Sequence, residues 1–143
     1  MTPTGSDYDQ WAWLYNKTLG PDYCAQKMVF LDRALLRTLA PDARVLDLCC
    51  GTGQMIVPLI ERGFDVTGLD LSTDMLKFAE KNASGAHFVQ GDARSFSFDQ
   101  QFNAVLCTSA SLNHMSGKAD LAAVFASVNH SLEPGGTFVF DIN

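Results

Sequence analysis

A short apolar run followed by a glycine loop constrains this chain more than any other feature. The run, at residues 44–48, contains an acid, Asp47, and leads directly into a loop with Gly51 and Gly53. Small residues let a loop's backbone approach a ligand closely, and the helix that follows begins with unpaired N–H groups. The next apolar run ends in Asp70, 19 residues after Gly51 (70 − 51 = 19). Because roughly 20 residues separate such a loop from an acid that binds ribose hydroxyls, the pattern predicts a nucleotide-cofactor pocket.

One position in the helix after the loop bears on which cofactor the pocket would take. A dinucleotide fingerprint has a third small residue three places after the second glycine, where the helix packs closely on a strand. This chain has Ile56 there. The loop also opens with Asp47, which would repel a pyrophosphate and would suit a ligand with an amino group. Both facts disfavour NAD and favour S-adenosylmethionine (SAM), which has an ammonium, a sulfonium and no phosphate.

With these residues in place, the chain from about residue 33 to residue 143 resembles a class I SAM-dependent methyltransferase, of the small-molecule type with a generic methyltransferase domain. Its landmarks follow the family order: the loop of residues 47–53, the ribose acid Asp70, the adenine-edge motif Gly91-Asp92-Ala93, the fourth strand within 102–108, and the turn at 132–136. Two positions depart from the pattern. Cys49 replaces the first glycine of the loop, and Asn103 stands where many relatives have an acid.

The resemblance implies a set of cofactor-binding residues. They are Asp47, Cys49, Gly51 and Gly53 at the methionine end, Asp70 at the ribose, Leu71 and Met75 around the adenine ring, Asp92 and Ala93 at the adenine edge, and Cys107 and Thr108 beside the methionine carbon chain. Tyr8 and Tyr15, from an aromatic N-terminal segment, would form a lid over the cofactor. For several of these residues the alternative is structural: a capping or turn acid, or a core side chain.

The acceptor side is less well defined by the sequence. Methyl transfer is an in-line displacement, so the protein mainly positions the nucleophile and excludes water. A general base is needed only if the acceptor is protonated. The candidates that follow the fourth strand are Ser109, Ser111, Asn113 and His114. His114 titrates near neutral pH, which makes it the candidate catalytic base, with a polar loop residue as the alternative.

Strand patterns alternate with helix patterns along the chain. Strands are expected at 44–48, 65–69, 87–90, 103–107 and 137–142, and helices at 22–39, 54–62, 73–82 and 118–132. Gly20-Pro21 is expected to interrupt the secondary structure before the helix at 22–39, and Pro58 is expected to kink the helix at 54–62. The alternation predicts an α/β fold, a Rossmann-like three-layer α/β/α sandwich with a mostly parallel sheet. The expected strand order is 3-2-1-4-5, without the family's last two strands. The domains are a helical lid segment at 1–40 and a SAM-binding core at 41–143.

Composition limits the partners and the location. The net charge is −6, from 10 basic and 16 acidic residues, and an acidic chain without a basic cluster is a poor candidate for binding nucleic acid. The chain has no run of 18 apolar residues and does not begin like a secretory signal, which predicts a cytoplasmic protein without a membrane span. Its four cysteines fit small core residues in a reducing compartment, and the adjacent Cys49 and Cys50 lack zinc-site spacing, so no metal is expected.

The leading function is methyl transfer from SAM to a small-molecule acceptor. The alternatives are a SAM-binding module that is inactive without a missing C-terminal part, an NAD-dependent oxidoreductase, and an aminopropyl transferase, for which acidic polyamine-binding features are missing. The expected strand at 137–142 is apolar and would form an edge of the sheet. Such edges recruit other chains, so we expect self-association there or a partner that covers the edge.

Overall fold

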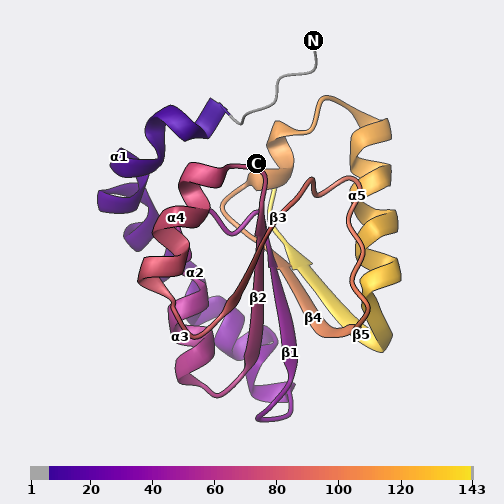
Figure 1. Cartoon of the computed structure of the whole chain (residues 1–143). Coiled ribbons are helices and arrows are strands. Elements are labelled where there is room, and N and C mark those ends of the chain that lie inside the picture. The colour runs from indigo at the N-terminus through magenta and orange to yellow at the C-terminus, as the bar shows by residue number, and fades with distance from the viewer. Residues whose placement is uncertain (1–6, 143) are drawn as a thin grey trace.

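A five-stranded parallel sheet forms the centre of the computed structural model, which describes residues 7–142, with side chains from Asp9 onward (Figure 1). The strand order is β3-β2-β1-β4-β5, and every pairing is parallel. The strands are β1 (Arg44–Leu48), β2 (Asp65–Asp70), β3 (His87–Gln90), β4 (Phe102–Cys107) and β5 (Leu132–Phe140). The expected Rossmann-like α/β fold and its strand order are therefore confirmed.

Helices cover both faces of this sheet. They are α1 (Ala12–Lys17), α2 (Leu19–Ala34), α3 (Ile56–Glu61), α4 (Thr73–Asn82) and α5 (Lys118–Ser131), with short 3-10 segments η1 (Asp7–Trp11), η2 (Leu36–Thr38) and η3 (Ser111–His114). In Figure 1, α5 lies on one side of the sheet, and α1, α3 and α4 lie on the other. Within the described residues, no helix is long and apolar enough to cross a membrane.

The apolar core is divided into two clusters, one on each face of the sheet. On one face, Leu31 of α2 and Leu59 of α3 pack against Val45 of β1. On the other face, Val124 and other apolar residues of α5 pack against Leu46 and its neighbours. Side chains from both faces of β1 are fully buried, which explains why this strand reads as a nearly continuous apolar run.

The strand register aligns the ends that carry the candidate site. Asp47 of β1 pairs with Gly68 of β2 and with Leu106 of β4. The loops that leave these three strands therefore emerge at one edge of the sheet. In open α/β sheets, ligands bind outside the carboxyl ends of the strands, at the point where the strand order reverses. Here that point lies between β1 and β4.

The two expected effects of proline are wrong. Helix α2 begins at Leu19 and contains Gly20 and Pro21 in its first turn, where a missing N–H breaks no intrahelical hydrogen bond. Helix α3 begins at Ile56, two residues later than expected, so Pro58 also falls in the first turn and has no preceding turn to kink. In both helices the proline lies in the first turn.

The end of the chain also differs from expectation. Strand β5 begins at Leu132, five residues earlier than expected, and includes the Gly135-Gly136 turn. A register shift between Phe102 and Ala104 of β4 accommodates the added residues, and Gly135 has a φ of 83°. A φ in the left-handed region suits glycine, which has no Cβ to clash. The division at residues 40 and 41 stays a prediction, although Leu31 of α2 packs into the same core as the sheet.

Candidate cofactor-binding site

A cavity of about 600 Å³ opens at the carboxyl ends of β1, β2 and β4. Its wall is built from the loops that follow these strands and β3, together with parts of α1, α2, α4 and α5. Most of the residues singled out from the sequence lie on it: Tyr15, Asp47, Cys49, Gly51, Asp70, Leu71, Met75, Asp92, Ala93, Thr108, Ser109, Ser111, Asn113 and His114. The fold therefore brings together residues that are up to about a hundred positions apart in the sequence.

Two of the proposed cofactor residues, Gly53 and Cys107, are placed differently, and a third, Tyr8, is not tested. Gly53 is not on the cavity wall; a Cβ on this glycine would lie 3.0 Å from Cα of Ala79 in α4, and its φ is 79°. Gly53 thus allows the loop to pack closely on α4. Cys107 is fully buried at the end of β4 and also does not line the cavity. The side chain of Tyr8 lies outside the described residues.

Asp47 has an electrostatic environment that suits a cationic ligand. Its side chain is 2% exposed, and its Oδ2 has no hydrogen-bond partner among the described residues. Burial disfavours the charged form and the nearby Asp70 adds repulsion, so the pKa of Asp47 rises to about 7. A buried polar atom without a partner is rare in folded proteins. An ammonium group in the cavity would supply a compensating charge.

Asp70 connects the end of β2 to the glycine loop. Its Oδ2 accepts a hydrogen bond from the backbone N–H of Gly51 at 2.8 Å, and its Oδ1 accepts one from Ser72 at 2.9 Å. Burial raises the pKa of Asp70, and these backbone donors oppose the rise. Since a carboxylate can accept about four hydrogen bonds, lone pairs remain for a ligand. Ser72, and not Asp70, caps α4, because its Oγ accepts from the N–H of Met75.

Strained backbone is concentrated around this cavity. Cys49, Ser109 and Ala110 have φ values of 59°, 64° and 56°, and among the described residues they are the only non-glycine ones with positive φ. All three line the cavity. Such strain persists where the surrounding structure over-determines the conformation, and it is concentrated at functional sites.

A carboxylate near the end of the chain holds the strained turn after β4. Asp141 accepts hydrogen bonds from the backbone N–H of Ser109 at 3.1 Å and of Ala110 at 2.6 Å. Lys27 of α2 pairs with the same carboxylate, and these contacts lower the pKa of Asp141 against the opposing effect of its partial burial. The turn leads directly into η3, which carries Ser111, Asn113 and His114. Sequence reasoning missed Asp141, because its partners lie 31 and 32 residues earlier in the chain.

The N-terminal segment docks beside the glycine loop through polar contacts. Asn16 of α1 accepts hydrogen bonds from Gln54 at 2.9 Å and from Asn82 of α4 at 2.6 Å. Asp9 of η1 accepts one from the hydroxyl of Ser72 at the start of α4. Tyr15 of this segment lines the cavity, and its role as a lid stays a prediction.

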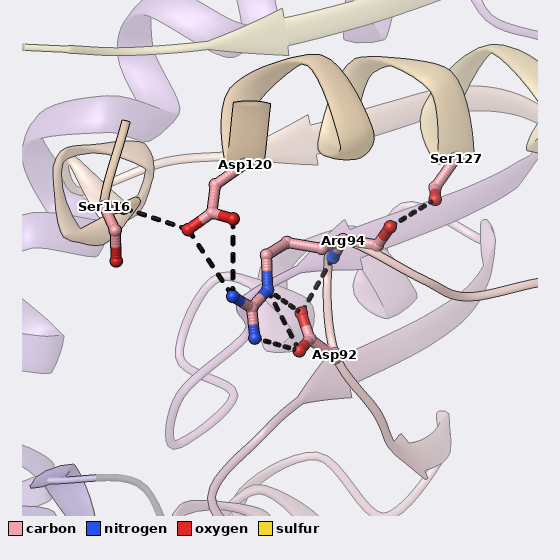
Figure 2. Close-up of polar contacts among 5 residues, drawn as sticks. All are labelled: Asp92, Arg94, Ser116, Asp120 and Ser127. Carbon is pink, nitrogen blue, oxygen red and sulfur yellow. Dashed lines mark hydrogen bonds and ion pairs between the residues drawn. The ribbon is translucent and has the colours of Figure 1, made fainter. Parts of the chain in front are cut away.

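An arginine that sequence reasoning missed lies on the adenine side. Arg94 follows Asp92 by two residues, and its guanidinium lies between Asp92 and Asp120 of α5 (Figure 2). All three residues line the cavity. The guanidinium of Arg94 contacts both carboxylates. The separation of Arg94 from Asp120 in sequence conceals the cluster, although an arginine just after an expected ligand acid was an available signal. Among the described residues, no group of three or more His, Cys, Asp or Glu side chains is placed to hold a metal ion.

The fold and the cavity define an α/β protein with an open cavity at the switch point of its sheet, where such sheets bind nucleotide cofactors. Residues 45–136 match the family model described as a methyltransferase domain, which covers more than half of the chain. The chain therefore belongs to the class I SAM-dependent methyltransferases.

Relatives and solved structures agree with this family. A dTDP-3-amino-3,4,6-trideoxy-alpha-D-glucopyranose N,N-dimethyltransferase of Streptomyces venezuelae is 37% identical over 123 residues, 85% of this chain and 51% of that protein. The crystal structure of Streptomyces venezuelae DesVI is similar, with a TM-score of 0.78 and 34% identity over 96% of this chain and 58% of that one. The glycopeptide N-methyltransferase MtfA, complexed with SAM, has a TM-score of 0.70 and 32% identity over 82% of this chain and 53% of that one. The chain thus spans about half the length of the relatives it matches.

Proposed function

We propose that this chain binds SAM in the cavity and transfers its methyl group to a small-molecule acceptor. The observation that carries the proposal is the buried carboxylate of Asp47, a residue of the cavity wall whose Oδ2 has no partner among the described residues. A ligand with an ammonium group fits that carboxylate, and a pyrophosphate does not. When bound, SAM supplies a methyl group on a positively charged sulfur. The fit supports SAM over NAD, as does membership of the methyltransferase family.

Each wall of the cavity would bind a different part of the cofactor. Asp47 would accept hydrogen bonds from the ammonium group, and Asp70 would use its remaining lone pairs for the ribose hydroxyls. Leu71 is 49% exposed and Met75 is buried, so an adenine ring between them would cover the exposed apolar surface of Leu71. Asp92 and the N–H of Ala93 would meet the adenine edge. Cys49, Thr108 and the Tyr15 lid would enclose the methionine part of SAM. Gly53 would contribute indirectly, by allowing the loop to pack closely on α4. Cys107 would contribute indirectly as a buried side chain at the end of β4.

The acceptor would approach along the turn after β4. Ser109, Ser111, Asn113 and His114 line the cavity there, and the contacts of Asp141 fix that turn. His114 is the candidate base that removes a proton from a protonated acceptor. Two similar proteins are named as N-methyltransferases of an amino sugar and of a glycopeptide. These names support a nitrogen nucleophile on a small-molecule acceptor. The net charge of −6 supports such an acceptor over a nucleic acid. All four cysteines are free, which supports a cytoplasmic location.

Calorimetric titration with SAM, S-adenosylhomocysteine and NAD tests the proposal. We expect the first two compounds to bind and NAD not to bind. Asp70→Asn should weaken binding about tenfold or more, the scale of losing charged hydrogen bonds. Asp65→Asn is the matched control, because Asp65 begins the same strand at the far end and is exposed. Binding of NAD without SAM would overturn the proposal. Binding of SAM without turnover across a panel of amines would favour a binding module.

A further inference from the structure

Arg94 holds the carboxylate of Asp92 in a two-pronged arrangement (Figure 2). The Nε of Arg94 donates to Oδ1 of Asp92 at 3.0 Å, and Nη2 donates to Oδ2 at 2.6 Å. The backbone N–H of Arg94 also donates to Oδ1, at 2.9 Å. Paired contacts between a guanidinium and a carboxylate fix orientation as well as supplying energy. The side chain of Asp92 is thus held in one direction by the residue two places after it.

The other edge of the Arg94 guanidinium faces the first turn of α5. Nη1 lies 3.4 Å from both carboxylate oxygens of Asp120, which in turn accepts the backbone N–H of Ser116 at 3.1 Å. The backbone carbonyl of Arg94 accepts a hydrogen bond from Ser127, further along the same helix. Arg94 is therefore anchored at its side chain and at its backbone, and Asp92 is oriented against a fixed frame.

Asp92 and Arg94 both line the cavity, and the side chain of Asp92 is 29% exposed. The hydrogen bonds from Arg94 lower the pKa of Asp92, against the effect of its partial burial. At neutral pH this carboxylate is consequently ionised and can only accept hydrogen bonds. A ligand group opposite it must be a donor, because an acceptor such as a carbonyl oxygen would be repelled.

We propose that Arg94 is a positioning residue that makes the site selective for an amino group, and against a carbonyl, at the edge of the purine ring. This inference rests on the proposed function, since it places the adenine of the cofactor against Asp92. In this role Arg94 acts through Asp92. Sites built to pair with a hydrogen-bonding group reject analogues that lack it far more strongly than apolar pockets do, and that rejection requires a fixed partner.

The test compares two ligands that differ only at the purine edge. S-adenosylhomocysteine has an amino group there, and S-inosylhomocysteine has a carbonyl. The wild-type chain should bind the adenosyl compound at least about tenfold more tightly by calorimetry, on the scale of one hydrogen bond to a charged group. Arg94→Gln should reduce this ratio at least about threefold. Arg94→Lys should do the same, because lysine keeps the charge but loses the planar fork.

Two controls separate positioning from a purely structural role. Arg37→Gln removes another exposed arginine–carboxylate contact, the one with Asp32, away from the cavity wall, and it should leave the ratio unchanged. Circular dichroism of each variant checks folding, and Arg94→Lys serves where Arg94→Gln does not fold. If the Arg94 variants weaken both ligands equally, or bind the adenosyl compound more tightly, the inference is overturned while the proposed function stands. If the wild-type chain binds neither compound, the proposed function falls, and the inference falls with it.

Discussion

At the scale of single residues, the carboxylate of Asp47 lowers the stability of the ligand-free fold but favours the binding of a cationic ligand. The buried carboxylate has an oxygen without a partner among the described residues, and its charge is close to that of Asp70. An ionised group in that position destabilises the protein without ligand. Functional sites commonly retain such groups, because the same arrangement that is unfavourable when empty binds the ligand strongly.

The ligand-free chain should therefore be more stable at pH 5 than at pH 8. The pKa of Asp47 is about 7 in the folded state against 3.8 in the unfolded state, so the folded state holds the proton between these values. Stability then falls as pH rises through this window, by at most roughly 4 kcal/mol. Asp70, with a raised pKa, acts in the same direction, whereas Asp92 and Asp141, with lowered pKa values, act only at more acidic pH. Urea unfolding at both pH values measures the difference.

Asp47→Asn should remove most of this pH dependence. The amide cannot ionise, so the variant should be more stable than the parent at pH 8 by about 1–3 kcal/mol, allowing for relaxation around the site. The same variant should bind S-adenosylhomocysteine at least about tenfold more weakly, because the charged partner of the ammonium is gone. A variant that keeps both the pH dependence and the affinity would contradict this account of the carboxylate.

Cys49 gives a second prediction at this scale, because its φ of 59° is one that glycine adopts without strain. A left-handed conformation costs a residue with a side chain roughly 1–2 kcal/mol, so replacing that residue with glycine removes the cost. The greater conformational freedom of glycine in the unfolded state offsets part of this gain in stability. Cys49→Gly should therefore be about 0.5–1 kcal/mol more stable than Cys49→Ala, which loses the thiol but keeps the strain. Thermal unfolding of the pair measures the difference. Equal stability would show that the strain is relieved elsewhere.

At the scale of elements, the packing of α3 on β2 explains how a large residue, Ile56, fits at this position of the helix. A Cβ added at Gly68 of β2 would lie 2.7 Å from Cδ1 of Ile56, 2.9 Å from Sγ of Cys50 and 2.9 Å from Cδ1 of Phe88. A dinucleotide fold places the small residue on the helix to allow close approach to the strand. Here the small residue is on the strand and the large one is on the helix.

Gly68→Ala should consequently destabilise the chain by about 1–3 kcal/mol through overpacking. Ile56→Val removes the Cδ1 atom that the new methyl group would meet, so the double variant should recover part of the loss. A double-mutant cycle by urea unfolding measures this coupling, which should be at least about 0.5 kcal/mol in the compensating direction. Additive effects would mean that Cys50 and Phe88, and not Ile56, limit the space at this position.

The elements that could be predicted from sequence are those with one dominant local signal. Buried parallel strands such as β1 and β4 are mostly apolar, and the loop after β1 contains two glycines. The order of these strands and the edge that they share could therefore be predicted from the pattern. Helix α2 was misjudged because proline disfavours the interior of a helix yet is compatible with its first turn. The contacts of Arg94 and Asp141 could not be predicted, since each joins residues that only the folded chain brings together.

At the scale of the whole molecule, β5 lies at one edge of the described sheet and carries an aromatic cluster beside that edge. Phe138 and Phe140 of β5 make edge-to-face contacts with Phe125 of α5, with ring centroids 5.6 and 5.3 Å apart, and lie 5.0 Å from each other. Phe140 is 39% exposed, and Ile142 just beyond it is 64% exposed. Strand edges with unpaired backbone groups and exposed apolar side chains are prone to pair with other chains. This combination supports the proposal that the chain associates through β5.

The 143-residue chain should therefore sediment as a dimer or larger species at high concentration and dissociate on dilution. Phe140→Lys should shift the equilibrium toward monomer about tenfold or more, because lysine at a strand edge opposes pairing and removes exposed apolar area. Val89→Lys is the matched control, since Val89 is an apolar side chain as exposed as Phe140 and lies on β3, at the opposite edge of the described sheet. Sedimentation velocity of the three proteins over a dilution series separates the outcomes. If both variants shift the equilibrium equally, association follows general surface apolarity; if only Phe140→Lys does, it runs through the β5 edge; and a monomer at all concentrations would rule association out.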